Sequence, residues 1–233
     1  MRPAALIFDV FGTLVDWRGS VAREVGAAFR AKGIDADPHL FADHWRAEYD
    51  PSMAPVRAGR RDYVALDDLH LENLQTVLAR LGLDHRFDAA ECRALATAWE
   101  RLDPWADVAA GLAAIRQEAL VAPCSNGSVA LMARLARHAG LHWDAILGAE
   151  IAHNYKPHPS VYQAACAALR LRPDQVMMVA AHNGDLEAAA ALGLQTAFIC
   201  RPVEHGAGQS SDLAPSGDWT LVADDLVDLA ARL

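Results

Sequence analysis

Short apolar runs alternate with helical patterns through the second half of the chain. Apolar runs bounded by turn residues are typical of buried strands. We expect such strands at residues 4–8, 120–124, 176–181, 195–200 and 219–222. Apolar residues at helical spacing lie between them, at residues 128–138, 159–169 and 185–192. This alternation predicts an α/β fold, in which helices cover both faces of a parallel sheet.

The segment between the first and second expected strands shows only helical periodicity. Helical stretches follow one another at residues 20–32, 40–49, 63–81 and 88–101. Ligands of open α/β sheets bind just outside the carboxyl ends of the strands, so helices inserted here would cover that crevice. We therefore expect a core of residues 1–15 and 97–233, with residues 16–96 forming a helical cap inserted after the first strand. The alternative is that these helices pack as an ordinary flank of the core.

Composition narrows the class of protein. The chain has 233 residues, of which 53% are hydrophobic and 22% charged, so a disordered or fibrous protein is excluded. Its net charge of −9 argues against nucleic acid or an anionic membrane as a partner. The four cysteines form no CxxC pair, which favours reduced thiols in the cytoplasm over a disulfide framework or a metal site. No apolar run is long enough for a signal peptide or a membrane span, and residues 203–217, rich in Gly, Ser and Pro, are expected to form a surface loop.

Polar side chains stand where the expected strands end. The segment LIFDVFGTL places Asp9 directly after the first strand. Burying a carboxylate at this position costs free energy unless cations or hydrogen-bond donors pair with it. This favours a functional role for Asp9 over a role as a turn cap. Ser125 and Asn126 follow LVAPC, Lys156 lies in HNYKPHPSVY, and Asp185 follows VMMVAAHNG. Because the carboxyl ends of parallel strands share one edge of the sheet, we expect these groups to meet in one crevice.

Lys156 is unusual in this chain. It is one of two lysines among 21 basic residues, and a compact ammonium can act as a point-charge partner for two carboxylates. Taken singly, these residues also have plain interpretations, as helix caps, a surface lysine and a first-turn helix acid. Their joint occurrence at the strand ends favours a catalytic site.

The order of these motifs resembles the haloacid dehalogenase superfamily. A DxxGT segment, a strand-end Ser, a Lys before Pro and a late Asp occur in that order, and the resemblance covers nearly the whole chain. It implies a Rossmann-like core with a cap and an aspartate nucleophile that becomes a covalent ester or phosphoester. In this sequence that nucleophile is Asp9.

Two positions argue against the phosphatases of this superfamily. Those enzymes place a second Asp two residues after the nucleophile, as general acid and Mg²⁺ ligand, where this chain has Phe11. They usually place another acid four residues before the late Asp, where this chain has Ala181. A phenyl ring can neither protonate a leaving group nor bind the metal. We therefore expect no metal and no cofactor.

A dehalogenase needs neither of the missing groups, because halide leaves without a proton. The segment HWRAEYDPSM resembles the WR-containing cap helix of the L-2-haloacid dehalogenase branch, which implies that Arg46 receives the departing halide. A solvated helix arginine is the alternative. The resemblance also implies supporting roles. Thr13 would hold Asp9, Ser125 with Asn126 would bind the substrate carboxylate, Lys156 would keep Asp9 ionised, Tyr162 would brace this network, and Asp185 would organise Lys156 and the hydrolytic water.

The sequence departs from the family pattern around the late Asp. Typical members have SSNxxD, whereas this chain has AAHNGD. His182 occupies the Asn position and Asn183 is displaced by one, so either could position the water, and a histidine could also act as a base. Gly184 stands where an aromatic residue often precedes the Asp, and Phe11 where typical members have Tyr. We interpret this pattern as an AAHN variant subgroup.

We expect hydrolysis of short 2-haloalkanoic acids to 2-hydroxy acids through an Asp9 ester, with inversion and with the small 2-haloacid as the only required partner. The sequence pattern is compatible with a homodimer. One alternative is another hydrolysis through the same ester, such as ring opening of a small strained cyclic acid or phosphatase activity. The other is a non-catalytic regulatory module, because fold alone does not fix function.

Overall fold

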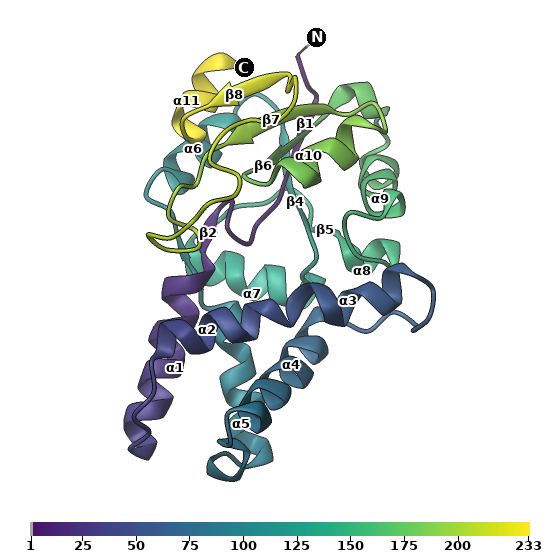
Figure 1. The fold of residues 1–233 in the computed structure, drawn as a ribbon. Coiled ribbons are helices and arrows are strands. Elements are labelled where there is room, and N and C mark those ends of the chain that lie inside the picture. The colour runs from purple at the N-terminus through teal and green to yellow at the C-terminus, as the bar shows by residue number, and fades with distance from the viewer. Residues whose placement is uncertain (1) are drawn as a thin grey trace.

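A parallel sheet forms the centre of the upper layer of the molecule (Figure 1). The computed structural model describes residues 2–233. The six strands have the order β5-β4-β1-β6-β7-β8, and all neighbouring pairs are parallel. They are β1 (Ala5–Phe8), β4 (Leu120–Ser125), β5 (Leu147–Gly148), β6 (Val176–Ala180), β7 (Gln195–Ile199) and β8 (Leu221–Ala223). The expected α/β fold with a Rossmann-like parallel sheet is confirmed.

All five expected strands are present, with ends that differ from the expectation by at most two residues. The additional strand β5 has only two residues, too few to show a pattern in the sequence. In the register of the central strands, Phe8 lies opposite Pro123 of β4 and Val179 of β6. The carboxyl ends of these strands are therefore aligned at one edge of the sheet.

Six helices accompany the sheet. They are α6 (Val108–Ile115), α7 (Val129–Ala139), α8 (Ala149–Ala152), α9 (Pro159–Leu169), α10 (Asn183–Ala190) and α11 (Leu226–Arg232). Helix α9 has the expected bounds, and Ser128 caps α7 by accepting a hydrogen bond from the backbone N–H of Leu131. The sequence pattern does not predict α6, because VAAGLAAI is apolar on all sides, nor the short α8 and α11. No helix within residues 2–233 is both long and apolar enough to cross a bilayer.

Both faces of the sheet are buried, which explains its unbroken apolar strands. Leu6 and Phe8 of β1 belong to a hydrophobic cluster with residues of α6, α7 and α11. Ile7 belongs to a second cluster with residues of α9 and α10. Successive side chains of a strand point to opposite faces, so a strand covered on both faces is apolar at every position.

A layer of helices lies below the sheet in Figure 1. Its elements are α1 (Trp17–Lys32), α2 (Pro38–Ala47), α3 (Tyr49–Arg57), α4 (Leu66–Arg80), α5 (Ala89–Ala96) and the 3₁₀ turns η1 (Asp84–Arg86) and η2 (Thr97–Glu100). The sequence pattern predicts this helical stretch but not α3 as a separate helix. The chain enters the layer through β2 (Val15–Asp16) and returns through β3 (Asp103–Pro104), which pair antiparallel. The two connections therefore lie side by side.

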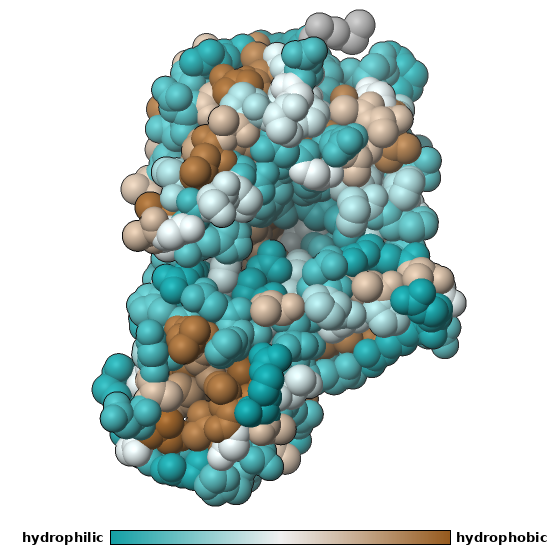
Figure 2. Space-filling view, viewed as in Figure 1, coloured by the Kyte–Doolittle hydropathy of each residue, from teal (hydrophilic) through white to brown (hydrophobic). Residues whose placement is uncertain are grey.

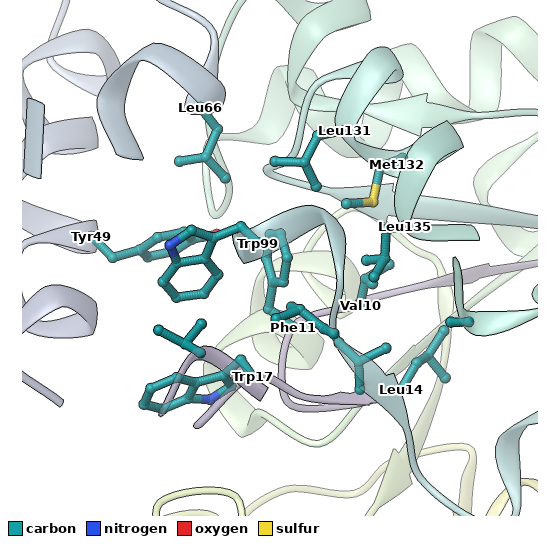
Figure 3. Close-up of a cluster of buried hydrophobic side chains, with 14 of the residues drawn as sticks. Val10, Phe11, Leu14, Trp17, Tyr49, Leu66, Trp99, Leu131, Met132 and Leu135 are labelled. Atoms are coloured by element: carbon teal, nitrogen blue, oxygen red, sulfur yellow. The ribbon is translucent and has the colours of Figure 1, made fainter. Parts of the chain in front are cut away.

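Aromatic side chains join the two layers (Figure 3). Phe11, in the loop after β1, meets Trp99 of η2 edge to face, with ring centroids 5.7 Å apart. Trp17 of α1 stacks on Trp99 at 6.2 Å, and Tyr49 of α3 stands edge-on to Phe11 at 6.3 Å. All four rings are buried. Each such pair contributes about 0.5–1.5 kcal/mol beyond burial, so the loop after β1 is held firmly against the helical layer.

Candidate active site

A cavity of about 220 Å³ lies between the carboxyl edge of the sheet and the helical layer. The molecular surface is visibly hollowed between these layers (Figure 2). Asp9, Lys156 and Asp185 line the cavity from the sheet side, and Arg46 and Tyr49 line it from the helical side. Asp9, Asn126 and Asp185 meet in this crevice, as the sequence predicts, whereas Lys156 reaches it from the turn between α8 and α9 and not from the end of a strand.

Lys156 connects the two carboxylates of the site. Its Nζ donates to Oδ1 of Asp9 at 2.9 Å and to Oδ2 of Asp185 at 2.5 Å. Their side chains are between 7% and 10% exposed, so solvent screens these charges little. Asp9 follows β1, Asp185 lies in the first turn of α10, and Lys156 precedes α9. The fold therefore brings one ammonium between two carboxylates that are distant in sequence.

The charges fix the protonation of the nucleophile candidate. Burial would raise the pKa of Asp9, but the Lys156 ammonium and the hydrogen bonds from His182 and Thr13 hold this pKa well below its ordinary value. Burial would lower the pKa of Lys156, but the charges of Asp185 and Asp9 raise it. Burial raises the pKa of Asp185 against the opposing charge of Lys156. Asp9 is therefore a carboxylate at neutral pH.

Two hydroxyl groups orient the carboxylates. Thr13 donates from Oγ1 to Oδ2 of Asp9 at 2.6 Å and accepts from the backbone N–H of Ala181 at 2.9 Å. Tyr162 of α9 donates its hydroxyl to Oδ1 of Asp185. Thr13 and Tyr162 are both buried, so each carboxylate is held in one orientation.

Ser125 and Asn126 take different positions at the end of β4. Asn126 lines the cavity, and its Oδ1 accepts the backbone N–H of Lys156 at 2.8 Å. This contact leaves the amide NH₂ as the end that can donate to a ligand. Ser125 is buried behind it, and its Oγ accepts from the backbone N–H of Gly127 at 3.1 Å. Of this pair, Asn126 is the residue that reaches the cavity.

Arg46 brings an unpaired positive charge to the cavity. Its guanidinium carbon lies 4.0 Å from the ring centroid of Tyr49 and 5.6 Å from that of Trp17. Within the described part of the chain no carboxylate forms a salt bridge with Arg46, and its buried Nε has no hydrogen-bond partner. A cation packed on aromatic rings and lacking a counter-ion is suited to receive an anion from the cavity.

His182 stands between two carboxylates. Its Nδ1 lies 3.1 Å from Oδ2 of Asp9, and its Nε2 lies 2.9 Å from Oε2 of Glu204. Burial would lower the pKa of this imidazole, but the hydrogen bonds with Asp9 and Glu204 raise it to about 10. The protonated ring can donate to both neighbours at once. Of the two residues considered for positioning water, His182 is the one that contacts Asp9.

Asn183 is directed into the loop between β7 and β8. Its Nδ2 donates to Oδ1 of Asp212 at 2.9 Å and to the carbonyl oxygen of Ala214 at 3.0 Å. Its Oδ1 accepts from Nε1 of Trp219 at 3.0 Å. The amide is thus engaged away from Asp9, and Asn183 anchors this loop.

Glu204 is a buried part of the site that the sequence pattern does not reveal. It lies in the stretch 203–217, expected as a surface loop, yet it is only 1% exposed. Trp17 donates from Nε1 to its Oε1 at 3.0 Å. A Cβ at Gly12, where φ is +89°, would stand 2.1 Å from that same oxygen, so Gly12 permits the close approach. No local pattern marks this acid, because its burial depends on residues distant in sequence.

The donor set around the carboxylates is poorly suited to a hard divalent cation. Within residues 2–233, no group of three or more His, Cys, Asp and Glu side chains is arranged to hold a metal ion. Phe11 and Ala181 offer no side-chain oxygen, whereas Mg²⁺ prefers octahedral oxygen ligands. The Lys156 ammonium already lies between Asp9 and Asp185. The arrangement instead supplies an ionised carboxylate, an amide donor and an unpaired cation around a small cavity.

Comparisons with known proteins agree with this geometry. The model of the haloacid dehalogenase-like hydrolases matches residues 3–193. The (S)-2-haloacid dehalogenase 4A of Burkholderia cepacia is 28% identical over 97% of this chain and 97% of its own. A defluorinating L-2-haloacid dehalogenase of known structure is 48% identical, with a TM-score of 0.98 over 99% of this chain and 95% of that chain. A second solved L-2-haloacid dehalogenase is 46% identical, with a TM-score of 0.95 over 100% of this chain and 98% of its own. The chain therefore belongs to the haloacid dehalogenase-like hydrolase family.

Proposed function

We propose that this protein hydrolyses short 2-haloalkanoic acids to 2-hydroxy acids through an ester formed on Asp9. The observation that carries the proposal is the pairing, around one cavity, of a buried ionised Asp9 with the unpaired cation of Arg46. Displacement of a halide requires a nucleophile on one side of the reacting carbon and an anion acceptor on the other. The related L-2-haloacid dehalogenases support the same reaction class.

In the first half-reaction, Asp9 attacks the carbon that bears the halogen. Its Oδ2 accepts hydrogen bonds from Thr13 and His182, whereas among residues 2–233 Oδ1 accepts one hydrogen bond, from Lys156. We assign the attack to Oδ1, because it has more free lone-pair density. The new C–O bond forms as the C–X bond breaks, with inversion, and halide leaves with the bonding electrons towards Arg46. The cation stabilises charge that develops only in the transition state.

The substrate carboxylate is oriented by the end of β4. The NH₂ group of Asn126 donates to it, and Ser125 supports the turn behind Asn126. Fixing the substrate in this way aligns the C–X bond with Asp9, and a misplacement of about 1 Å at such a site can cost roughly 100-fold in rate.

In the second half-reaction, water attacks the Cγ of the Asp9 ester. The C–O bond to the substrate remains intact, so the hydroxy acid carries an oxygen that came from Asp9. The overall products are the 2-hydroxy acid, halide and one proton. Both half-reactions use the substrate, water and side chains of this protein, and the scheme includes no cofactor.

We further propose that residues 16–96 form the main part of a cap on a core of residues 1–15 and 97–233, in which η2 (Thr97–Glu100) still packs in the helical layer before the chain re-enters the core at β3. Support comes from Arg46 and Tyr49, which reach the cavity from the helical layer and face Asp9 across it. The paired connections β2 and β3 would allow this layer to be placed as a unit. The free thiols of all four cysteines are consistent with a reducing compartment such as the cytoplasm.

A halide-release panel tests the proposed function. Fluoro-, chloro- and bromoacetate and both enantiomers of 2-chloropropionate are incubated with the wild-type protein and with Asp9→Asn. We expect halide and hydroxy acid in equal amounts from the S enantiomer and none with the variant. Fluoroacetate belongs in the panel because the relative with 48% identity is a defluorinating enzyme. Phosphate release from a phosphomonoester, or binding of haloacid without turnover, would favour the phosphatase or the regulatory alternative.

A further inference from the structure

We propose that Glu204 is a positioning residue for hydrolysis of the Asp9 ester. It holds His182 so that Nδ1 faces the ester and takes the proton from the attacking water. The proposal rests on the proposed function, because it assigns the second half of that reaction. Glu204 touches neither Asp9 nor the cavity and would act through His182 alone.

The geometry gives the imidazole one orientation. Both carboxylate oxygens of Glu204 lie near Nε2 of His182, at 2.9 and 3.2 Å. The carboxylate is itself fixed by the indole N–H of Trp17 and by the close approach of Gly12. With Nε2 occupied in this way, Nδ1 is the nitrogen that points to Asp9, 3.1 Å from its Oδ2.

Esterification changes the charges that His182 experiences. In the resting protein the ring lies between the anions of Asp9 and Glu204, with Lys156 beyond Asp9 and His205 within 3.6 Å of Glu204. Forming the ester removes the charge of Asp9, so the pKa of His182 falls and the ring can lose its proton. The neutral ring then keeps Nε2–H on Glu204 and presents a lone pair at Nδ1. A base oriented by a buried carboxylate is a recurrent arrangement in ester hydrolysis.

The protons balance in this scheme. The proton lost by His182 on esterification is the one that the overall reaction releases. Water then adds to Cγ while Nδ1 takes one of its protons, and the tetrahedral intermediate expels the hydroxy-acid oxygen, which receives that proton from His182. The protonated Asp9 finally transfers its proton to Nδ1, which restores the resting pair. The first half-reaction uses none of these transfers, because halide leaves unprotonated.

The two half-reactions should therefore respond differently to Glu204→Gln. The glutamine keeps a hydrogen-bond acceptor of nearly the same size for Nε2 but removes the charge. In a single turnover of (S)-2-chloropropionate we expect a halide burst within about twofold of wild type, followed by ester decay slowed by roughly tenfold or more. The ester is followed by rapid quench as a mass increase on the peptide that contains Asp9, and the burst itself counts the folded sites.

A pH profile distinguishes an effect of the Glu204 charge from a purely structural effect of the substitution. Loss of the anion lowers the pKa of His182 in the ester, so ester decay in Glu204→Gln should reach its plateau at lower pH than in wild type. Glu204→Asp keeps the charge and should keep the wild-type midpoint with a reduced rate. Gln209→Ala is the matched control, because Gln209 holds the same loop through the backbone N–H of His205 and carries no charge. It should leave both half-reactions and the midpoint unchanged.

The outcomes are distinct. A slowed decay with an intact burst and a lowered midpoint supports the role of Glu204. An unchanged decay, or a parallel loss of burst and decay with an unshifted midpoint, overturns it while leaving the proposed function in place. A wild-type protein without any halide burst would overturn the proposed function and this inference together.

Discussion

The Nζ of Lys156 lies 2.9 Å from Oδ1 of Asp9, and both side chains are almost completely buried. Replacing this lysine by methionine should therefore impair the nucleophile. Burial raises the pKa of Asp9, and Lys156→Met removes the largest opposing charge, so this pKa should rise. Because only ionised Asp9 attacks, the acid limb of the halide-release profile should move to higher pH, with roughly 100-fold lower kcat/KM at pH 7.

The other lysine of the chain supplies the control for this experiment. Lys32 on α1 pairs with Glu91 at 2.6 Å, remote from the cavity lining. Lys32→Met should keep the wild-type profile. An acid limb that stays in place in Lys156→Met would show that Asp9 does not depend on the ammonium.

Arg46→Lys tests the halide acceptor. The substitution keeps the charge but loses the planar guanidinium that packs on Tyr49. Since the cation would then be misplaced by about 1 Å or more, halide release should fall by roughly 100-fold. Arg80→Lys is the matched change outside the cavity, where Arg80 pairs with Glu48, and should be neutral. If Arg46→Lys kept half or more of the wild-type turnover, Arg46 would have no part in the reaction.

His182 should make stability depend on pH. Its pKa is raised from 6.5 to about 10 in the folded protein, so the folded state binds the proton more tightly than the unfolded chain. The resulting stabilisation is complete below about pH 6.5 and is lost as the pH rises through about 10. Thermal unfolding of wild type and His182→Gln, compared at pH 6 and pH 10, checks this. The difference in Tm between the two proteins should be larger at pH 6, and an equal difference at both pH values would contradict the charge on His182.

Catalysis should continue in excess EDTA. Phe11 and Ala181 provide no oxygen ligand, and the Lys156 ammonium repels a cation placed between Asp9 and Asp185. Halide release from 2-chloropropionate and phosphate release from a small phosphomonoester are measured on one preparation, with EDTA and with added Mg²⁺. We expect halide release in both conditions and negligible phosphate release. Dominant, EDTA-sensitive phosphate release would place the protein with the phosphatases.

The sequence indicates the sheet and the strand-end residues because both depend on local patterns. Asp9 and Asn126 follow apolar runs, and aligned parallel strands bring such positions together without any further information. Elements without a recognisable hydrophobic period cannot be predicted in this way. Strand β5 has two residues, and α6 is apolar on every side, so neither carries a recognisable period.

The part of the site around His182 is not readable from the sequence for a different reason. Glu204 is buried by Trp17 and His182, which lie far from it along the chain. Its neighbours are polar and glycine-rich, which is the composition of an exposed loop. The choice between His182 and Asn183 likewise depends on where α10 begins, and one residue at a helix start turns a side chain to another side.

The central claim is that Asp9 becomes covalently bound to the substrate carbon, and isotope labelling tests it most directly. A single turnover of (S)-2-chloropropionate in ¹⁸O-water, with enzyme in excess, is followed by mass spectrometry of the hydroxy acid and of the peptide that contains Asp9. The account predicts label in Asp9 and an unlabelled hydroxy acid, because the product oxygen comes from the carboxylate and water only replaces it. Label found first in the hydroxy acid, with Asp9 unlabelled, would mean that water attacks the substrate directly and would contradict the ester mechanism.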